Sequence, residues 1–130
     1  MKKVAKLAIK DSEENYLLLT LNNHPTFGNS WDLPGGTADG DESPVETMIR
    51  EVHEEIGVDI RKDEVTEVYS GTDYSTHGTQ YTLFTTRLDT APDIRLSWEH
   101  SSYEWVSHKD FLDAAKNAND TYMHMVADVM

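Results

Sequence analysis

Residues 43–57 carry the signals that start, continue and stop a helix, and they constrain the fold of this chain more than any other stretch. Ser43 favours the N-cap, Pro44 suits the first helical position, and Glu46 completes a capping box with Ser43. Gly57 favours the left-handed conformation that ends a helix. The sequence therefore predicts a helix from the Ser43 cap to about Ile56. Its apolar side chains recur at helical spacing on one stripe: Val45, Ile49, Val52 and Ile56.

Around this helix, apolar runs alternate with turn residues and with further helix signals. Before the helix we expect a β-hairpin with a longer loop from the runs at 4–10 and 16–21, a loop at 22–30, and a short apolar segment at 31–33. A break at 34–36 then continues as loop to 42. After the helix we expect strands at 65–74, 80–88 and 103–106, a helix at 108–117, and a last helix from an Asp120 cap to about 130. Strands interleaved with helices predict an α/β or α+β fold.

Length and charge narrow the class of protein. A chain of 130 residues has the usual size of one domain, so we expect a single domain over residues 1–130. Its 24 acidic and 11 basic residues give a formal net charge of −13. This excess argues against binding of a nucleic-acid polymer, whose phosphates are held by clustered Lys and Arg. An anionic substrate needs another source of positive charge, and a divalent cation is the obvious candidate.

Cysteine and membrane signals are missing from the sequence. Without cysteine there is no disulfide, no thiolate zinc site and no cysteine nucleophile. The apolar positions of residues 1–10 are interrupted by Lys6 and stop at Lys10. A signal peptide needs roughly 7–15 apolar residues in a row and a membrane span roughly 20. We therefore expect a soluble, cytoplasmic protein that does not contact membranes, either a monomer or a homodimer.

Three glutamates on the predicted helix form an arrangement that folding alone disfavours. Glu51, Glu54 and Glu55 stand at i, i+3 and i+4, so their carboxylates project from one face. The like-charged pair Glu51 and Glu55 costs roughly 0.2–0.5 kcal/mol. Glu54 and Glu55 also lie in the last turn, where the helix dipole disfavours negative charge by roughly 0.3–1 kcal/mol each. Every one of these local contributions to the stability of the helix is unfavourable.

Two interpretations fit such a cluster. It is either a solvated acidic face with Arg50 and Lys62 as partial counter-charges, which is the ordinary meaning of a charge run, or a site for a hard cation. Mg²⁺ and Mn²⁺ prefer carboxylate and water ligands. Composition does not separate the two interpretations, but the spacing of the residues around the cluster does.

The spacing matches a known motif. Gly36 is followed by five residues and Glu42, then by seven residues and the run REVHEEIGV from Arg50 to Val58. This pattern resembles the Nudix hydrolase signature, G-x5-E-x7-R-E-U-x-E-E-x-G-U with U a bulky aliphatic residue, at all nine specified positions. A chance match over all possible starts is on the order of 10⁻⁸. The preceding Trp31-Asp32-Leu33-Pro34-Gly35 is similar to the approach to this motif.

The resemblance implies an α/β/α sandwich with a mixed sheet, in which the motif forms a catalytic loop–helix–loop. It also implies hydrolysis of a nucleoside diphosphate linked to another group, with Mg²⁺ or Mn²⁺ as cofactor. Glu51 or its neighbour would orient the attacking water, Arg50 would hold Glu51 in place, and Glu42 would support the cluster. The implied metal ligands are Glu51, Glu54, Glu55 and a backbone carbonyl of Gly36 or Gly35.

Residues outside the motif complete the expected site. In many Nudix relatives a late acidic residue joins the metal site, and Glu99 is the candidate here, with a solvated loop residue as the alternative. Tyr74 lies about where members that act on diadenosine polyphosphates carry a substrate tyrosine. Trp31 is a candidate to stack on a nucleobase, with core packing as the alternative. Residues 22–30 contain no Lys or Arg, so either Lys3, Lys6 and Arg87 supply charge near the phosphates from strands, or the metal neutralises nearly all of the phosphate charge.

The leading hypothesis is metal-dependent hydrolysis of a pyrophosphate bond in a nucleoside triphosphate or related nucleotide. The alternatives are a dinucleoside polyphosphate hydrolase and a non-hydrolytic, nucleotide-sensing domain of the same fold. The isomerase branch of the superfamily relies on a cysteine, which this chain lacks. An acidic metal-buffering domain would bind metal even if the spacing of the motif were shuffled.

Overall fold

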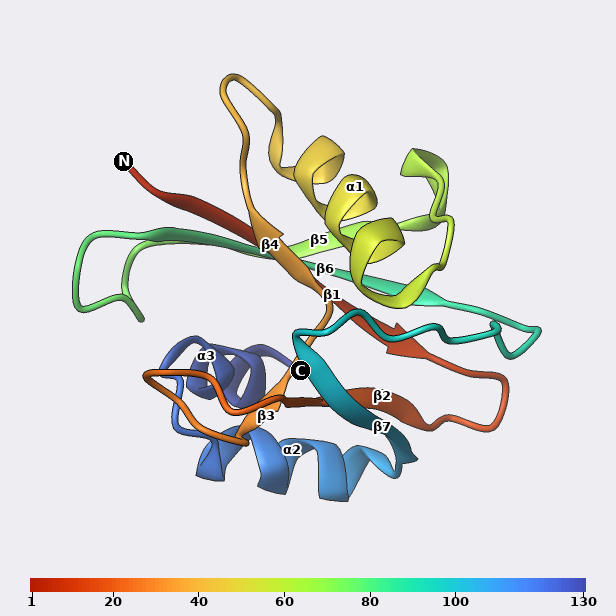
Figure 1. Ribbon diagram of the computed structural model, residues 1–130. Coiled ribbons are helices and arrows are strands. Elements are labelled where there is room, and N and C mark those ends of the chain that lie inside the picture. The colour runs from red at the N-terminus through yellow and green to blue at the C-terminus, as the bar shows by residue number, and fades with distance from the viewer.

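A mixed seven-stranded sheet forms the middle layer of the computed structural model, which describes residues 1–130. Helix α1 (Pro44–Ile56) covers one face, and helices α2 (His108–Asn117) and α3 (Tyr122–Val129) cover the other (Figure 1). A short 3₁₀ helix, η1, spans Lys62–Glu64. The strands are β1 (Lys3–Lys10), β2 (Tyr16–Leu21), β3 (Trp31–Asp32), β4 (Gly35–Thr37), β5 (Thr66–Gly71), β6 (Gln80–Arg87) and β7 (His100–Val106). The expected α/β/α sandwich with a mixed sheet is confirmed.

The sheet is built around β1, which has three partners. The order is β3-β2-β1-β6-β5, with β4 also paired to β1 and β7 also paired to β2. Strand β1 runs parallel to β6 over its whole length, and the other pairs are antiparallel. The expected hairpin of β1 and β2 pairs only next to its turn, where Lys10 faces Tyr16. Beyond that pair the strands diverge, β1 toward β4 and β6, and β2 toward β3 and β7 (Figure 1).

Alternation along β1 places apolar side chains on both faces of the sheet. Leu7 and Ile9 pack in a cluster with Met48 and Val52 of α1, whereas Ala8 packs in a second cluster with residues of α2 and α3. A strand covered by helices on both sides needs apolar residues at successive positions. By the two-residue period, Lys6 shares the face of Ala8, and it is buried there.

The helix at 43–57 forms as predicted. Both halves of the capping box are present, and Gly57 ends α1 in the left-handed conformation with φ of 70°. The apolar stripe is centred differently from the expectation. Met48, Val52 and Ile56 are fully buried, while Val45 and Ile49 are only partly buried at its edge.

Other boundaries differ because pairing between distant strands sets them. The expected break and loop from residue 34 contain strand β4, which pairs with β1 through its glycines. Strand β5 ends at Gly71, and β7 starts at His100 because it pairs with β2 as far as Leu21. The N-cap of α3 is Thr121 rather than Asp120, although the Asp120 carboxylate accepts the Tyr122 N–H at 3.2 Å. None of the helices has the length and apolar character needed to cross a membrane.

Candidate active site

Two glycines bring the chain into close contact with its neighbours at the start of the motif. Gly35 has φ of +140°, and a Cβ there would lie 2.1 Å from the carbonyl oxygen of Ala5 on β1. At Gly36 a Cβ would lie 2.4 Å from Cδ of Glu51 and 2.5 Å from its Oε2. Because glycine has no side chain, β4 lies against β1 and the Glu51 carboxylate lies against the backbone of β4.

The Arg50 guanidinium ties the loop before α1 to the carboxylates on it. Its Nε and Nη2 donate to the two carboxylate oxygens of Glu42 at 2.8 and 2.9 Å, and Nη1 donates to Glu51 Oε1 at 2.9 Å. Nη2 also donates to the carbonyl of Thr37 at 3.1 Å. These hydrogen bonds, with one from the Asp39 N–H, lower the pKa of Glu42 to about 2. Glu42 and Glu51 are therefore held by one cation with fixed geometry.

The three glutamates of the cluster differ in their surroundings. Glu54 is exposed and has only long contacts to Arg50, at 3.3 and 3.4 Å. Glu51 is half-buried, and burial raises its pKa even though Arg50 opposes the shift. Glu55 is 4% exposed and accepts the Gly35 N–H at 3.2 Å. Burial raises the pKa of Glu55 to about 8, and the charges of Asp32 and Glu99 add to the shift.

These groups line a cleft of about 330 Å³. We call the part bounded by Glu51, Glu55, Glu99 and the two glycines the acidic end. The part bounded by Lys6, Asp32, Tyr81, Asp120 and Tyr122 is called the inner end. Lys2, Val4, Leu21, His24, Phe27 and Thr37 complete the lining.

The inner end contains a buried, bonded set of charged and polar side chains. Lys6 Nζ donates to Asp32 Oδ1 at 3.0 Å and to the carbonyl of Leu33 at 3.1 Å. Tyr122 Oη donates to the same Asp32 oxygen, and His100 Nε2 lies 2.9 Å from Asp32 Oδ2. Burial alone would raise the pKa of Asp32, but the Lys6 charge and these hydrogen bonds outweigh it and lower the pKa to about 2.

Lys6 is charged because the carboxylates around it outweigh the effect of its burial. Burial acts to lower its pKa, but the negative charges of Asp32 and Glu55 outweigh burial and raise it. Two of its three N–H donors are used within the protein, and the side chain still lines the cleft. Lys6 is therefore a fixed cation at the inner end.

The residues predicted outside the motif are distributed unevenly. Glu99 is exposed and lines the acidic end of the cleft. Trp31 lies on β3 and packs against the core on the side of α2 and α3. Tyr74 Oη donates to Asp128 at 2.6 Å, and Arg87 pairs with Glu14 where β6 meets the end of β1. Of these four residues, only Glu99 borders the cleft.

Several cleft residues were not singled out from the sequence. Asp32, Asp120 and Tyr122 come from segments separated by up to 90 positions, and no local pattern links them. One signal was available: Lys6 is a charged residue inside an otherwise apolar strand, and such a residue needs a buried partner.

The donor set at the acidic end suits a hard divalent cation. As they stand, no three acidic, histidine or cysteine side chains are arranged to hold a metal ion. The carboxylates of Glu51 and Glu55 are nevertheless destabilised by burial and by neighbouring negative charge, which a cation would relieve. Gly36 lets the Glu51 carboxylate lie against the backbone of β4, next to its carbonyl and N–H groups. These oxygen donors therefore fit Mg²⁺ or Mn²⁺ in kind.

Fold and site together define a class: an α/β/α sandwich whose loop–helix segment brings glutamates and glycine backbone to one cleft. A sequence model of the NUDIX domain matches residues 1–128, and the chain belongs to this family. A relative from Mycobacterium tuberculosis, named putative 8-oxo-dGTP diphosphatase 3, is 34% identical over 94 residues, which cover 66% of this chain and 41% of the relative. This chain thus matches less than half of that relative's length.

Solved structures show the same fold. The structure of a MutT/nudix family protein from Enterococcus faecalis has a TM-score of 0.75 at 20% identity, covering 98% of this chain and 60% of that one. The C. elegans Ap4A hydrolase, in a binary complex, has a TM-score of 0.71 at 22% identity, covering 97% and 91%.

Proposed function

We propose that this chain hydrolyses a pyrophosphate bond in a nucleoside triphosphate or a related nucleotide, with Mg²⁺ or Mn²⁺ as cofactor. The observation that carries the proposal is the meeting of Glu51, Glu55 and Glu99 with the backbone of Gly35 and Gly36 on one cleft, in a member of the NUDIX family. The relative named as an 8-oxo-dGTP diphosphatase supports a nucleotide substrate.

We assign the metal to Glu51, Glu54, Glu55, Glu99 and the backbone of Gly36. Such an ion, when bound, neutralises phosphate charge and lowers the pKa of a water molecule. Arg50 fixes the orientation of Glu51 through the 2.9 Å hydrogen bond and, through Glu42, fixes the loop before α1. In the overall reaction one P–O–P bridge breaks, the oxygen of water forms the new P–O bond, and the released proton passes to solvent.

The substrate's other contacts follow from the rest of the cleft. Lys6 is the buried cation of the lining, so it can face an electronegative group of the substrate. Tyr81 at the inner end stacks on Tyr122, and Phe27 elsewhere in the lining stacks on His24, so each ring has at most one face for a nucleoside. Trp31, Tyr74 and Arg87 do not line the cleft, so we do not assign the nucleoside or the phosphates to them.

The test uses the exposed member of the cluster. Glu54→Gln removes one charge from a side chain with no short contacts, so the fold should be unaffected. We expect at least a ~100-fold loss of product release from a panel of nucleoside triphosphates with Mg²⁺ or Mn²⁺. Phosphate, pyrophosphate and nucleoside monophosphate are all measured. Glu67→Gln, an exposed glutamate on β5, is the matched control and should keep full activity.

Two results would contradict the proposal. One is undiminished hydrolysis in Glu54→Gln. The other is nucleotide binding that raises the melting temperature of the wild type without any turnover, which would favour the non-hydrolytic sensor.

A further inference from the structure

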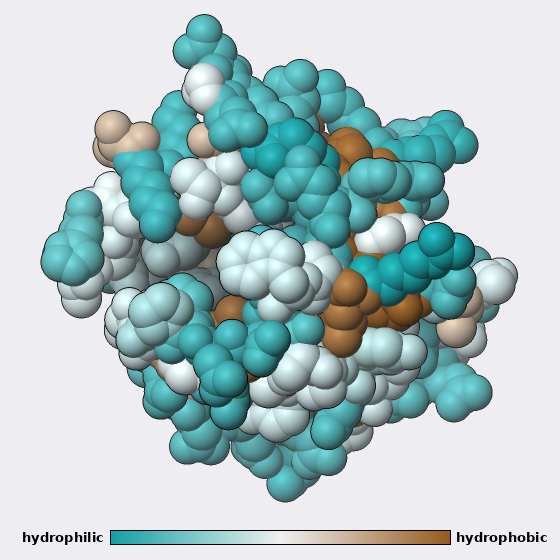
Figure 2. Space-filling model, in the orientation of Figure 1, coloured by the Kyte–Doolittle hydropathy of each residue, from teal (hydrophilic) through white to brown (hydrophobic).

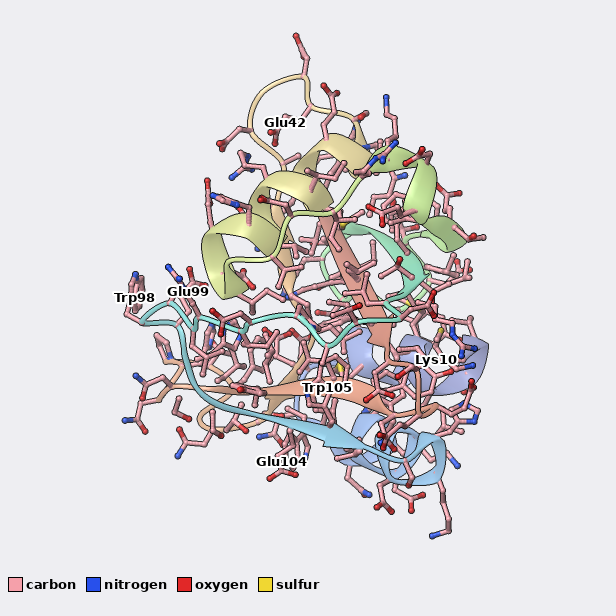
Figure 3. The ribbon with its side chains drawn as sticks, turned by 90° about the vertical axis from the view of Figure 1, so that its right-hand side faces the viewer. Lys10, Glu42, Trp98, Glu99, Glu104 and Trp105 are labelled. Atoms are coloured by element: carbon pink, nitrogen blue, oxygen red, sulfur yellow. The ribbon has the colours of Figure 1, made fainter.

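Trp98 is a large apolar side chain that the fold leaves in solvent. It is 82% exposed, whereas Trp31 and Trp105 are partly buried and pack against the two cores. Figure 3 shows Trp98 beside Glu99 at the outer tip of the segment that leads into β7. Figure 2 shows that one face of the molecule is mostly hydrophilic, with only small apolar areas. A single exposed apolar side chain is ordinary, but this indole adjoins a residue of the candidate active site.

The exposure of Trp98 does not come from a loose loop. The Ser97 N–H donates to the carbonyl of Glu55 at 2.8 Å, which ties the segment to α1. On the other side, the Asn22 N–H donates to the carbonyl of Glu99 at 2.8 Å, and Asn22 Nδ2 donates to the carbonyl of Trp98 at 3.1 Å. The backbone is bonded in both directions, so the main chain of Trp98 is held at a fixed position beside Glu99.

Trp98 forms one wall of a second hollow, of about 310 Å³, which we call the outer hollow. Leu21, His24 and Pro25 give it further apolar and flat surface, and Asn22, Asn23 and Glu99 give it polar groups. Leu21, His24 and Glu99 also line the main cleft, so the two spaces adjoin. Flat apolar walls with a few polar groups are typical of a site for a planar ring.

We propose that the outer hollow binds a second planar ring, carried at the far end of the substrate's phosphate chain. The main cleft already offers the rings of Tyr81 and Phe27 to one nucleoside, and its acidic end offers carboxylates to the metal and phosphates. A ring in the outer hollow would lie on Trp98, just beyond Glu99. The substrate class is then two nucleosides joined by a polyphosphate. This inference rests on the proposed function, because it assigns the phosphates to the acidic end.

The experiment compares a two-ring probe with a one-ring probe. Three proteins are compared, all carrying Glu54→Gln: one with Trp98 unchanged, one with Trp98→Ala and one with Trp98→Phe. Each is titrated with diadenosine tetraphosphate and with ATP in the presence of Mg²⁺, and affinity is measured by calorimetry. We expect Trp98→Ala to weaken binding of diadenosine tetraphosphate ~10-fold and that of ATP less than ~2-fold, while Trp98→Phe keeps most of the affinity. Tyr103→Ala, which removes another exposed ring, is the control and should change neither.

Two outcomes overturn the inference: equal weakening for both probes, which would place Trp98 in the site for a single nucleoside, or no weakening for either. Binding is read without turnover, so the result does not depend on hydrolysis. Failure of the proposed function would appear separately, as an inactive wild type in the product assay.

Discussion

At the inner end of the cleft, Lys6, Asp32 and Tyr122 are buried and bonded to one another. At the acidic end, the carboxylates of Glu51 and Glu55 have fewer hydrogen-bond and charge partners to offset their burial. The environment lowers the pKa of Asp32 to about 2 but raises that of Glu55 to about 8. Both carboxyls are buried, so burial alone does not explain the difference. Asp32 has a cation and two further partners, and Glu55 has one backbone N–H. The set of Lys6, Asp32 and Tyr122 balances its own charge, while the acidic end gains from an added cation.

Breaking the compensated end should have the largest effect on stability. Asp32→Asn leaves the Lys6 ammonium buried without its counter-charge, and we expect a loss of about 3–5 kcal/mol in the free energy of unfolding. Urea denaturation measures it. The double variant Lys6→Met, Asp32→Asn removes the orphan charge and should recover part of the loss. A single variant as stable as the wild type would show that the inner end does not depend on this pair.

The two glycines of β4 sharpen the comparison, because one faces the scaffold and the other faces Glu51. Gly35→Ala places a Cβ against backbone at a positive φ and should cost about 3 kcal/mol or more of stability. Gly36→Ala meets only the end of the Glu51 side chain, which can move. We expect little change in melting temperature for Gly36→Ala, but a ~10–100-fold loss of nucleotide hydrolysis because the carboxylate is displaced. Equal effects on both properties in the two variants would contradict this division.

The dependence of stability on acid pH tests the contribution of the Asp32 carboxylate at the inner end. The folded-state pKa of Asp32, about 2, lies below its ordinary value of 3.8, so the folded state holds fewer protons between these values. Its contribution, about 2 kcal/mol, is present above pH 3.8 and is lost as the pH falls toward 2. Unfolding of the wild type should therefore show an acid-dependent loss that is smaller in Asp32→Asn. Asp41→Asn, at an exposed site, is the control and should follow the wild type.

The contrast between the two ends also explains what could be predicted from sequence. Helix α1 was predictable to the residue because Ser43, Pro44 and Gly57 act through atoms a few positions away. Two of the three carboxylates of the acidic end, those of Glu51 and Glu55, were predictable because they come from that one helix and its spacing matches a known motif. Strand β4 was missed because Pro34-Gly35-Gly36 favours a break locally, and only pairing with β1 makes it a strand.

The inner end could not be predicted for a different reason. Lys6 and Asp32 are 26 positions apart, and Tyr122 is 90 positions beyond Asp32, so only the packed fold brings them together. The helix period alone also gave no warning that Glu54 would stay in solvent while Glu55, its neighbour, would be buried beneath β4.

Removing the uncompensated charge should have an effect of opposite sign to that of Asp32→Asn. The folded-state pKa of Glu55, about 8, lies above its ordinary value of 4.5, so the folded state binds more protons in this range. Stability of the wild type without metal therefore falls as the pH rises from about 4.5 to 8. The side chain of Gln does not ionise, so the stability of Glu55→Gln should not decrease over this pH range. In EDTA we expect this variant to match the wild type near pH 5 and to be more stable near pH 9 by about 3–4 kcal/mol, the value that follows from a pKa raised from 4.5 to about 8. Urea unfolding at the two pH values measures the difference. A Gln variant that is less stable near pH 9 would mean that the Glu55 carboxylate is compensated after all, and that the two ends of the cleft do not differ as their hydrogen bonds indicate.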